Sequence, residues 1–255
     1  MQQVGNRWDF DGSTMIAPTE LLRSGEPVCV SVRSFRSVWV QLWRDVLFLH
    51  WRVPIESLRT NLPPDLEIDT FGGDAWLSAV LFRLKVRPCG LPFLPLLSTL
   101  VEVNLRTYVT CRGVPGIYFL SIHADNRPAA AVAKLFTPLP YRHAKLAYRC
   151  EVDAGQFDSA MLKASFHTET GEAATEVGSL DEFLLERYRL YAPNRRGALL
   201  QAEVRHPRWR TQRVEVSLER CRLGEEFGLE LSRAPDESYF SAGVPALFGR
   251  FQRIV

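Results

Sequence analysis

The stretch EVNLRTYV, residues 102–109, places a polar side chain at every second position. Glu102, Asn104, Arg106 and Tyr108 alternate there with mainly apolar residues. A period of two is typical of a β-strand with two different faces, so these side chains project on the same side. That side either meets water or lines a cavity, and the spacing leaves both interpretations open. An acid, an amide, a base and a phenol in one row have the hydrogen-bonding capacity of a buried polar network.

Strand patterns recur along most of the chain and predict a sheet-rich fold. Helices are expected in residues 55–62, in the Ala-rich residues 127–136, and after Ser179, whose spacing to Glu182 matches a capping box. Because these helices do not alternate with strands, a single β-rich α+β domain with an antiparallel, barrel-like sheet fits better than a doubly wound fold. The expected strands are residues 45–53, 66–71, 74–86, 99–112, 116–125, 144–152, 159–169, 198–206, 213–221 and 249–255.

The composition fits one large globular domain. The 255 residues are 46% hydrophobic and 24% charged, which provides an ample core and argues against disorder. The 31 basic and 29 acidic side chains give a formal net charge of +2, which argues against an extended nucleic-acid-binding surface. No linker divides the chain, so we expect residues 1–37 to form an irregular leader and residues 38–255 to form one domain.

Cysteines and apolar segments indicate the compartment. The five cysteines are odd in number, widely spaced and without a C-x-x-C pair, so they are expected to be free thiols in a reducing compartment. Residues 1–13 lack the apolar centre of a signal peptide, and the most apolar stretch, residues 90–101, is interrupted by Pro92 and Pro95. These features predict a cytoplasmic protein with no membrane partner.

Several motifs for cofactors and catalytic nucleophiles are absent from the sequence. It has no Gly-rich phosphate loop, no G-x-S-x-G elbow and no H-E-x-x-H pattern. The five histidines are far apart along the chain, so they do not form a metal-binding motif. We therefore expect no cofactor and no metal site.

Charge is segregated in the second half of the chain. Residues 151–186 carry nine acidic side chains and one lysine, a formal −8, whereas residues 187–213 carry eight arginines and one glutamate, a formal +7. Aromatic residues lie between the arginines, which is also a pattern of nucleic-acid-binding segments. Adjacent segments of opposite sign can instead neutralise each other across a hairpin or an interface. The second interpretation is favoured, so no nucleic-acid partner is expected.

Seven segments between residues 43 and 209 resemble those of one protein family. They are WRDVLFLHWRVP, LRTNLPPDLEIDTFGGDAWLSAVLF, VEVNLRTYV, GVPGIYFLSI, PLPYRHA, FLLERYRLY and HPRW, in that order. In this combination the chain resembles the YqjF-like family of uncharacterised bacterial proteins, a domain of unknown function in the acetoacetate-decarboxylase-like superfamily. The resemblance implies an antiparallel β-barrel with a central cavity and a few short helices. It also implies that the polar row of residues 102–108 faces the lumen.

The resemblance has one chemical departure. In the decarboxylases, a lysine that follows a proline forms a Schiff base with the keto acid, and a neighbouring lysine lowers its pKa. In the similar segment here, Pro140 is followed by Tyr141 and Arg142, neither of which can form an imine. Lys134 and Lys145 lie near this segment but out of register with it, and either is left open as an alternative amine that acts by a different route. Decarboxylation through an imine is therefore not expected.

The sequence predicts a cavity protein that binds or transforms a small polar carboxylate or carbonyl compound. An arginine suits a carboxylate because its planar guanidinium donates two parallel hydrogen bonds. Two alternatives stay open: a non-enzymatic binding or interaction protein whose polar row is only structural, and nucleic-acid binding through residues 187–213. A homo-oligomer is also left open. The candidate catalytic residues are Glu102 and Tyr141, and the candidate ligand-binding residues are His50, Asn104, Arg106, Tyr108 and Arg142.

Overall fold

The computed structural model describes residues 31–32, 35–94, 97–169 and 171–254. Most of the expected leader, residues 1–30 and 33–34, therefore lies outside the described residues. The described part of it contains the short strand β1 (Ser31–Val32) and the start of β2 (Phe35–Val53). The expected domain boundary at residue 38 stays a prediction.

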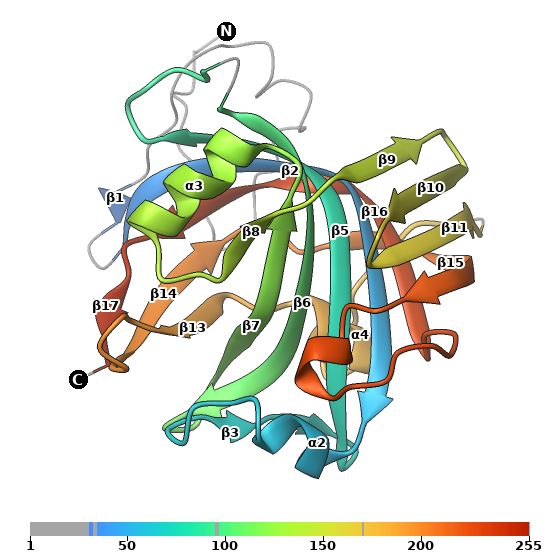
Figure 1. The fold of residues 1–255 in the computed structure, drawn as a ribbon, viewed down its shortest axis with the longest axis horizontal. Helices are drawn as coiled ribbons and strands as arrows, with labels where there is room; N and C mark the ends of the chain where they lie inside the picture. The colour runs from blue at the N-terminus through green and yellow to red at the C-terminus, as the bar shows by residue number, and fades with distance from the viewer. Residues whose placement is uncertain (1–30, 33–34, 95–96, 170, 255) are drawn as a thin grey trace, which may run out of the picture.

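One 17-stranded sheet, with a few short helices at its ends, makes up the described chain (Figure 1). The mostly-sheet class predicted from the sequence is confirmed. None of the helices in the described ranges has the length and apolarity needed to cross a membrane. After β1 and β2, the strands are β3 (Glu67–Ile68), β4 (Thr70–Phe71), β5 (Asp74–Pro88), β6 (Thr99–Cys111), β7 (Val114–Ala124), β8 (Tyr141–His143), β9 (Leu146–Cys150), β10 (Ala154–Ser159), β11 (Leu162–Thr168), β12 (Ala173–Ala174), β13 (Arg189–Pro193), β14 (Leu199–Arg205), β15 (Arg210–Cys221), β16 (Glu237–Gly249) and β17 (Gln252–Arg253).

The helices lie where local sequence signals favour them. In α3, Asn126 accepts a hydrogen bond from the Ala129 amide, and a proline occupies the first turn. In α4, Ser179 accepts a hydrogen bond from the Glu182 amide, as expected for a capping box, but the Glu182 carboxylate accepts one from the Gly178 amide and not from that of Ser179. The helices are α2 (Ile55–Arg59), α3 (Arg127–Phe136), α4 (Leu180–Leu185) and the 3₁₀ helix η1 (Glu225–Phe227).

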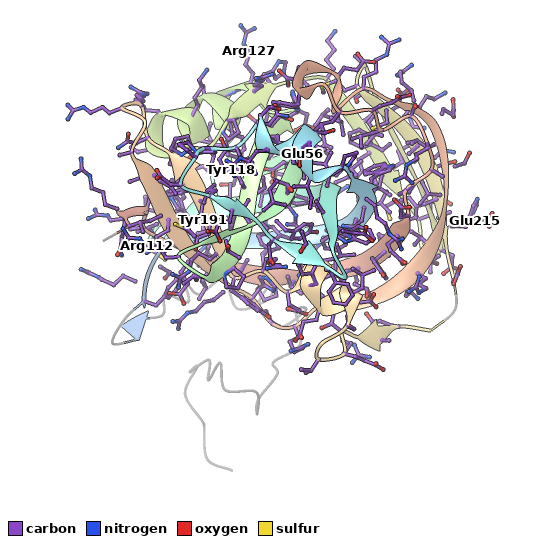
Figure 2. The ribbon with its side chains drawn as sticks, turned by 90° about the horizontal axis from the view of Figure 1, so that it is seen from below. Glu56, Arg112, Tyr118, Arg127, Tyr191 and Glu215 are labelled. Atoms are coloured by element: carbon purple, nitrogen blue, oxygen red, sulfur yellow. The ribbon has the colours of Figure 1, made fainter. Side chains whose placement is uncertain are left out.

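The strand pairings close into a ring. Strand β2 pairs with β5, β5 with β6 and β6 with β7, all antiparallel. Strand β7 then pairs in parallel with β13, and β13, β14, β16 and β2 complete the circuit through antiparallel pairs. The parallel pair matches Tyr191 with Tyr118, and Figure 2 labels both residues at the end of the ring that is seen from below.

The two long strands β2 and β16 bend together at one point. Strand β2 has a break in register between Arg44 and Leu47, where Asp45 adopts a φ of 53°. Opposite this break, Gly243 adopts a φ of 117°, and a Cβ atom there would lie 1.9 Å from the Trp43 carbonyl oxygen. Only glycine permits both this backbone conformation and this close approach. The sequence analysis missed β16 altogether, because Gly243 and Pro245 interrupt its strand pattern.

Each long strand of the ring has an inner and an outer apolar face. Phe48 and Phe82 belong to the inner cluster, whereas Leu49 and Leu81 belong to the outer one. The outer cluster includes Phe157 of β10, from a smaller part of the sheet formed by β9, β10, β11 and β15. Between the two strands expected at residues 144–152 and 159–169, the structure has a further strand, β10, which pairs with both β9 and β11 and was not predicted. Alternation along the strands thus leaves the inner face for a cavity.

Candidate functional site

The inside of the ring contains a cavity of about 830 Å³. Its wall is mostly apolar, with side chains from β2, β5, β6 and β7 on the ring and from α3. Trp43 and Phe48 from β2, Phe82 from β5 and Phe119 from β7 are among these apolar residues. A largely apolar enclosure with a few polar groups is typical of a small-molecule site.

The polar row of β6 faces this cavity rather than water. Glu102, Asn104 and Arg106 all line the cavity, and Glu102 and Asn104 are each only 3% exposed. Tyr108 is the fourth member of the row, but it lies beyond the end of the cavity and is fully buried. The row therefore runs along the inner face of the ring, and three of its members border the cavity.

Glu102 is a buried carboxyl group with two hydrogen-bond donors. The Tyr141 hydroxyl donates to Oε2 at 3.0 Å, and the Asn104 amide donates to Oε1 at 3.1 Å. Burial raises the pKa of Glu102 to about 7, while these two hydrogen bonds act in the opposite direction by favouring the carboxylate. Close to neutral pH, Glu102 can therefore both donate and accept a proton.

Tyr141 enters the cavity from β8. This short strand pairs in parallel with β7, and the pairing sets Tyr141 beside Ile122, which also lines the cavity. Burial is the main cause that raises the pKa of the Tyr141 hydroxyl well above its usual value, and the nearby Glu102 carboxyl adds to it. Tyr141 is thus a neutral hydrogen-bond donor to Glu102 over the ordinary pH range.

Arg142 does not line the cavity, contrary to its expected place there. Its guanidinium lies on the surface and forms a 2.7 Å ion pair with Glu226. The reason is strand geometry: adjacent residues of a strand point to opposite faces, so Tyr141 inside requires Arg142 outside.

Arg106 is the arginine that the polar row of β6 brings to the cavity, whose wall also includes Arg187, Arg189 and Arg250. Its Nε is buried and has no hydrogen-bond partner within the described chain, and its guanidinium lies 6.0 Å from the centre of the Phe48 ring. Burial lowers the pKa of Arg106, and the neighbouring Tyr108 partly opposes this. In the part of the chain that the structure describes, no ion pair joins Arg106 to Glu102 or to another carboxylate. A desolvated guanidinium of this kind favours a ligand anion.

His50 and Tyr108 form a network beneath the cavity instead of lining it. The Ser78 hydroxyl lies 2.6 Å from His50 Nδ1 and 2.7 Å from the Tyr108 hydroxyl. Tyr108 also donates a hydrogen bond of 2.8 Å to the Leu184 carbonyl of α4. Burial, with a smaller contribution from Arg106, lowers the pKa of His50 well below its usual value, so the ring is neutral. These residues close the end of the cavity at which Arg106 lies, and Tyr108 is a neighbour of Arg106.

Arg187 and Trp209 also line the cavity, and the sequence analysis did not propose either of them. The Arg187 guanidinium forms a 2.7 Å ion pair with Asp69 and lies 4.2 Å from the centre of the Phe183 ring. Both residues belong to the basic segment that was considered for nucleic acid, and no periodic pattern there marks the cavity face. On the cavity wall, the Trp209 ring stacks on the ring of Trp43.

None of the chain's four lysines lines the cavity. Lys134 and Lys145, the two considered as alternative amines, are both exposed. Among the described residues, no group of three His, Cys, Asp or Glu side chains could hold a metal ion. The side chains available for chemistry at this cavity are therefore one carboxyl, one phenol, the amides of Asn104 and Gln41, the hydroxyls of Ser98 and Thr137, and guanidinium groups.

The fold is similar to that of enzymes with solved structures. One is the enduracididine biosynthesis enzyme MppR, in complex with the condensation product of pyruvate and imidazole 4-carboxaldehyde, with a TM-score of 0.60 and 15% identity over 90% of this chain and 97% of that one. Another is an acetoacetate decarboxylase from Legionella pneumophila, with a TM-score of 0.60 and 13% identity over 95% of this chain and 97% of that one. The acetoacetate-decarboxylase-like fold expected from the resemblance is confirmed.

Relatives in sequence define the family. The uncharacterised protein YqjF of Bacillus subtilis is 35% identical over 221 residues, which are 83% of this chain and 91% of YqjF. The model of the DUF2071 family, described as an uncharacterised conserved protein, matches residues 40–245. The chain thus belongs to the DUF2071 family, built on an acetoacetate-decarboxylase-like fold.

Proposed function

We propose that the cavity binds a small organic acid that also carries a carbonyl group, and that Glu102 exchanges a proton with it. The observation that supports this most is the pair of opposite groups on one strand face: a carboxyl with a pKa of about 7 at Glu102 and, at Arg106, a guanidinium whose Nε is buried without a hydrogen-bond partner in the described residues. Arg106 holds the carboxylate of the ligand, and Glu102 acts as acid or base. The similarity to MppR, which has a solved complex with pyruvate, favours the same ligand class.

The proposed chemistry needs no imine. The Glu102 carboxylate takes a proton from the carbon next to the carbonyl group, and the electron pair of that C–H bond moves toward the carbonyl oxygen. Arg106 lies on the same face and stabilises that charge, while Asn104, whose side-chain Oδ1 is buried without a hydrogen-bond partner in the described residues, orients the ligand by accepting a hydrogen bond from it. Return of the proton from Glu102 to carbon restores the ligand, so the exchange balances.

Binding is tested with matched acids and amides. Pyruvate, acetoacetate and lactate should bind more tightly than their neutral amides in isothermal titration calorimetry, because only the acids offer an anion to Arg106. Arg106→Met should weaken the binding of the acids about tenfold or more and remove their advantage over the amides. Arg142→Met is the matched control, since it removes a surface guanidinium of the same kind and should leave the preference intact.

Proton exchange is tested by nuclear magnetic resonance in heavy water. The protein should speed the loss of hydrogen from the carbon next to the ligand's carbonyl group, and Glu102→Gln should remove this effect while acids still bind. Acids that bind without any faster exchange would identify a binding protein rather than an enzyme. Amides that bind as tightly as the acids, or an unchanged preference in Arg106→Met, would contradict the proposal as a whole.

A further inference from the structure

The cavity is much larger than the ligands proposed so far. Acetoacetate has seven heavy atoms, and at about 30 Å³ for each water-sized group it would occupy at most about 200 Å³. The cavity has about 830 Å³, so about 600 Å³ would stay unfilled by such a ligand. Water in that space would meet few polar partners, because most of the wall is apolar.

On the inner faces of β5 and β6, polar and apolar side chains of the cavity wall are separated along the strands, and Gln41 and Ser98 are polar lining residues near the apolar end. On the inner face of β6, Arg106, Asn104 and Glu102 are followed toward the start of the strand by Leu100. The six residue-to-residue steps from Arg106 to Leu100 span about 20 Å at roughly 3.3 Å per residue. Strand β5 follows the same direction, since Phe82 is paired with Glu102 and Leu84 with Leu100. All the polar members of the row are therefore at one end.

The polar end is closed and the apolar end is not. Beyond Arg106, the fully buried Tyr108 hydroxyl is bonded to the backbone of α4. At the other end, Leu94 before β6 and Val132 and Phe136 of α3 line the cavity and are 47%, 37% and 66% exposed. A ligand that enters past α3 with its charged group first would reach Arg106 and leave its remaining length against apolar walls.

We infer that the ligand of this site is an amphipathic acid, with its carboxylate at Arg106 and an apolar body of roughly eight or more carbons that extends toward α3. This inference rests on the proposed function for the placement of the carboxylate and adds the size and polarity of the rest of the molecule. The apolar body stabilises the complex because it removes both its own surface and the cavity wall from water.

A series of straight-chain carboxylic acids with four to about fourteen carbons tests the inference by isothermal titration calorimetry. Affinity should rise about threefold to fourfold for each added methylene until the cavity is filled, in line with ~0.8 kcal/mol per buried methylene. The heat-capacity change of binding should become more negative along the series, because apolar burial has that signature.

Two variants of α3 locate the apolar body. Ala133 lines the cavity, so Ala133→Trp should shorten the apolar end and weaken the binding of the longest acids about tenfold, with butanoate unaffected. Ala131 is exposed on the same helix and does not line the cavity. Ala131→Trp should therefore leave the affinity for the longest acids and for butanoate unchanged.

The outcomes separate this inference from the proposed function. Affinity that does not depend on chain length in the unmodified protein, while short acids still exceed their amides, would overturn the inference and leave the proposed function standing. Long amides that bind as tightly as long acids would support the apolar site and overturn the role of Arg106. If Ala133→Trp lowered the affinity for short and long acids by the same factor, the inference would also be overturned.

Discussion

The carboxyl group of Glu102 is subject to two opposite influences. Burial favours its protonated form, whereas the donors Asn104 and Tyr141 favour its carboxylate, and the result is a pKa of about 7 against the ordinary 4.5. The folded protein therefore holds more protons than the unfolded chain between these two pH values. Stability from this group is complete below about pH 4.5 and is lost as the pH rises through about 7.

The loss of stability with rising pH gives a first prediction, for Glu102→Gln. Between about pH 5 and about pH 8, the free energy of unfolding of the unmodified protein should fall relative to the Gln variant by on the order of 2–3 kcal/mol, because one pKa unit corresponds to about 1.4 kcal/mol. Urea unfolding at both pH values measures the difference. Glu226→Gln, which removes an exposed carboxylate, is the control and should show a difference below about 1 kcal/mol. A pH-independent difference for Glu102→Gln would place its pKa near the ordinary value.

A second prediction concerns the stability cost of Arg106. A buried guanidinium without a carboxylate partner opposes folding, so Arg106→Met should raise the free energy of unfolding by about 1–3 kcal/mol even though it weakens ligand binding. The same change at the exposed Arg142 should alter stability by at most about 1 kcal/mol. Thermal melts of both variants without ligand provide the measurement. A less stable Arg106→Met protein would mean that the guanidinium has a compensating partner.

The feature that was hardest to predict from the sequence was which individual side chains face the cavity. The spacing of residues 102–108 correctly indicated one shared face, but only closure of the ring decides that this face is the inner one. Arg142 was misplaced because a resemblance between short segments does not specify which of two adjacent residues points inward. For Arg187 and Trp209 no local signal existed, since their position depends on contacts with distant strands.

At the scale of elements, the paired bend of β2 and β16 depends on one glycine. The third prediction is that Gly243→Ala lowers the free energy of unfolding by more than about 3 kcal/mol, because the new Cβ would meet the Trp43 backbone in addition to the strain of a positive φ. Gly197 also has a positive φ, of 81°, but open space around it, so Gly197→Ala should cost about 1–2 kcal/mol. Urea midpoints compare the two, and equal losses would mean that the bend can relax around a methyl group.

Elements with strong local signals could be predicted from the sequence. Helix α3 spans the expected residues 127–136, and the cap at Ser179 begins α4 as expected. Strand β16 could not be found, because a glycine and a proline normally end strands, and pairing with most of β2 and with β14 and β15 compensates for them. Pairing between strands that are distant in the sequence thus determines that these residues form a strand, although their local preferences do not favour one.

At the scale of the whole molecule, the two oppositely charged segments neutralise each other in part. Arg208 forms a 2.8 Å ion pair with Glu182, and Arg210 forms one of 2.9 Å with Glu172. Each pair joins the acidic residues 151–186 to the basic segment, which was the favoured interpretation of the charge pattern. Arginines held in this way are less available to phosphate groups.

The fourth prediction follows for nucleic acid. Binding of single-stranded DNA should be weak, in the range of about 10⁻⁴–10⁻⁶ M that is typical of non-specific contacts, and should vanish at moderate salt. Fluorescence anisotropy of a labelled oligonucleotide over a salt series measures this. Sub-micromolar affinity at physiological ionic strength would instead support a nucleic-acid-binding role for residues 187–213.

The ring also divides the residues of β5 and β6 by number into those that line the cavity and those that pack in the outer cluster. Along β5 and β6, the residues that line the cavity are even-numbered, whereas the odd-numbered residues between them, such as Leu81 and Leu105, pack in the outer cluster. Substitutions at even positions can therefore change what the cavity accepts without disturbing the outer core. Divergence within such a family, or a mutant library built by design, can alter specificity through this one half of each strand: Val80, Phe82, Leu84, Val86, Leu100, Glu102, Asn104 and Arg106.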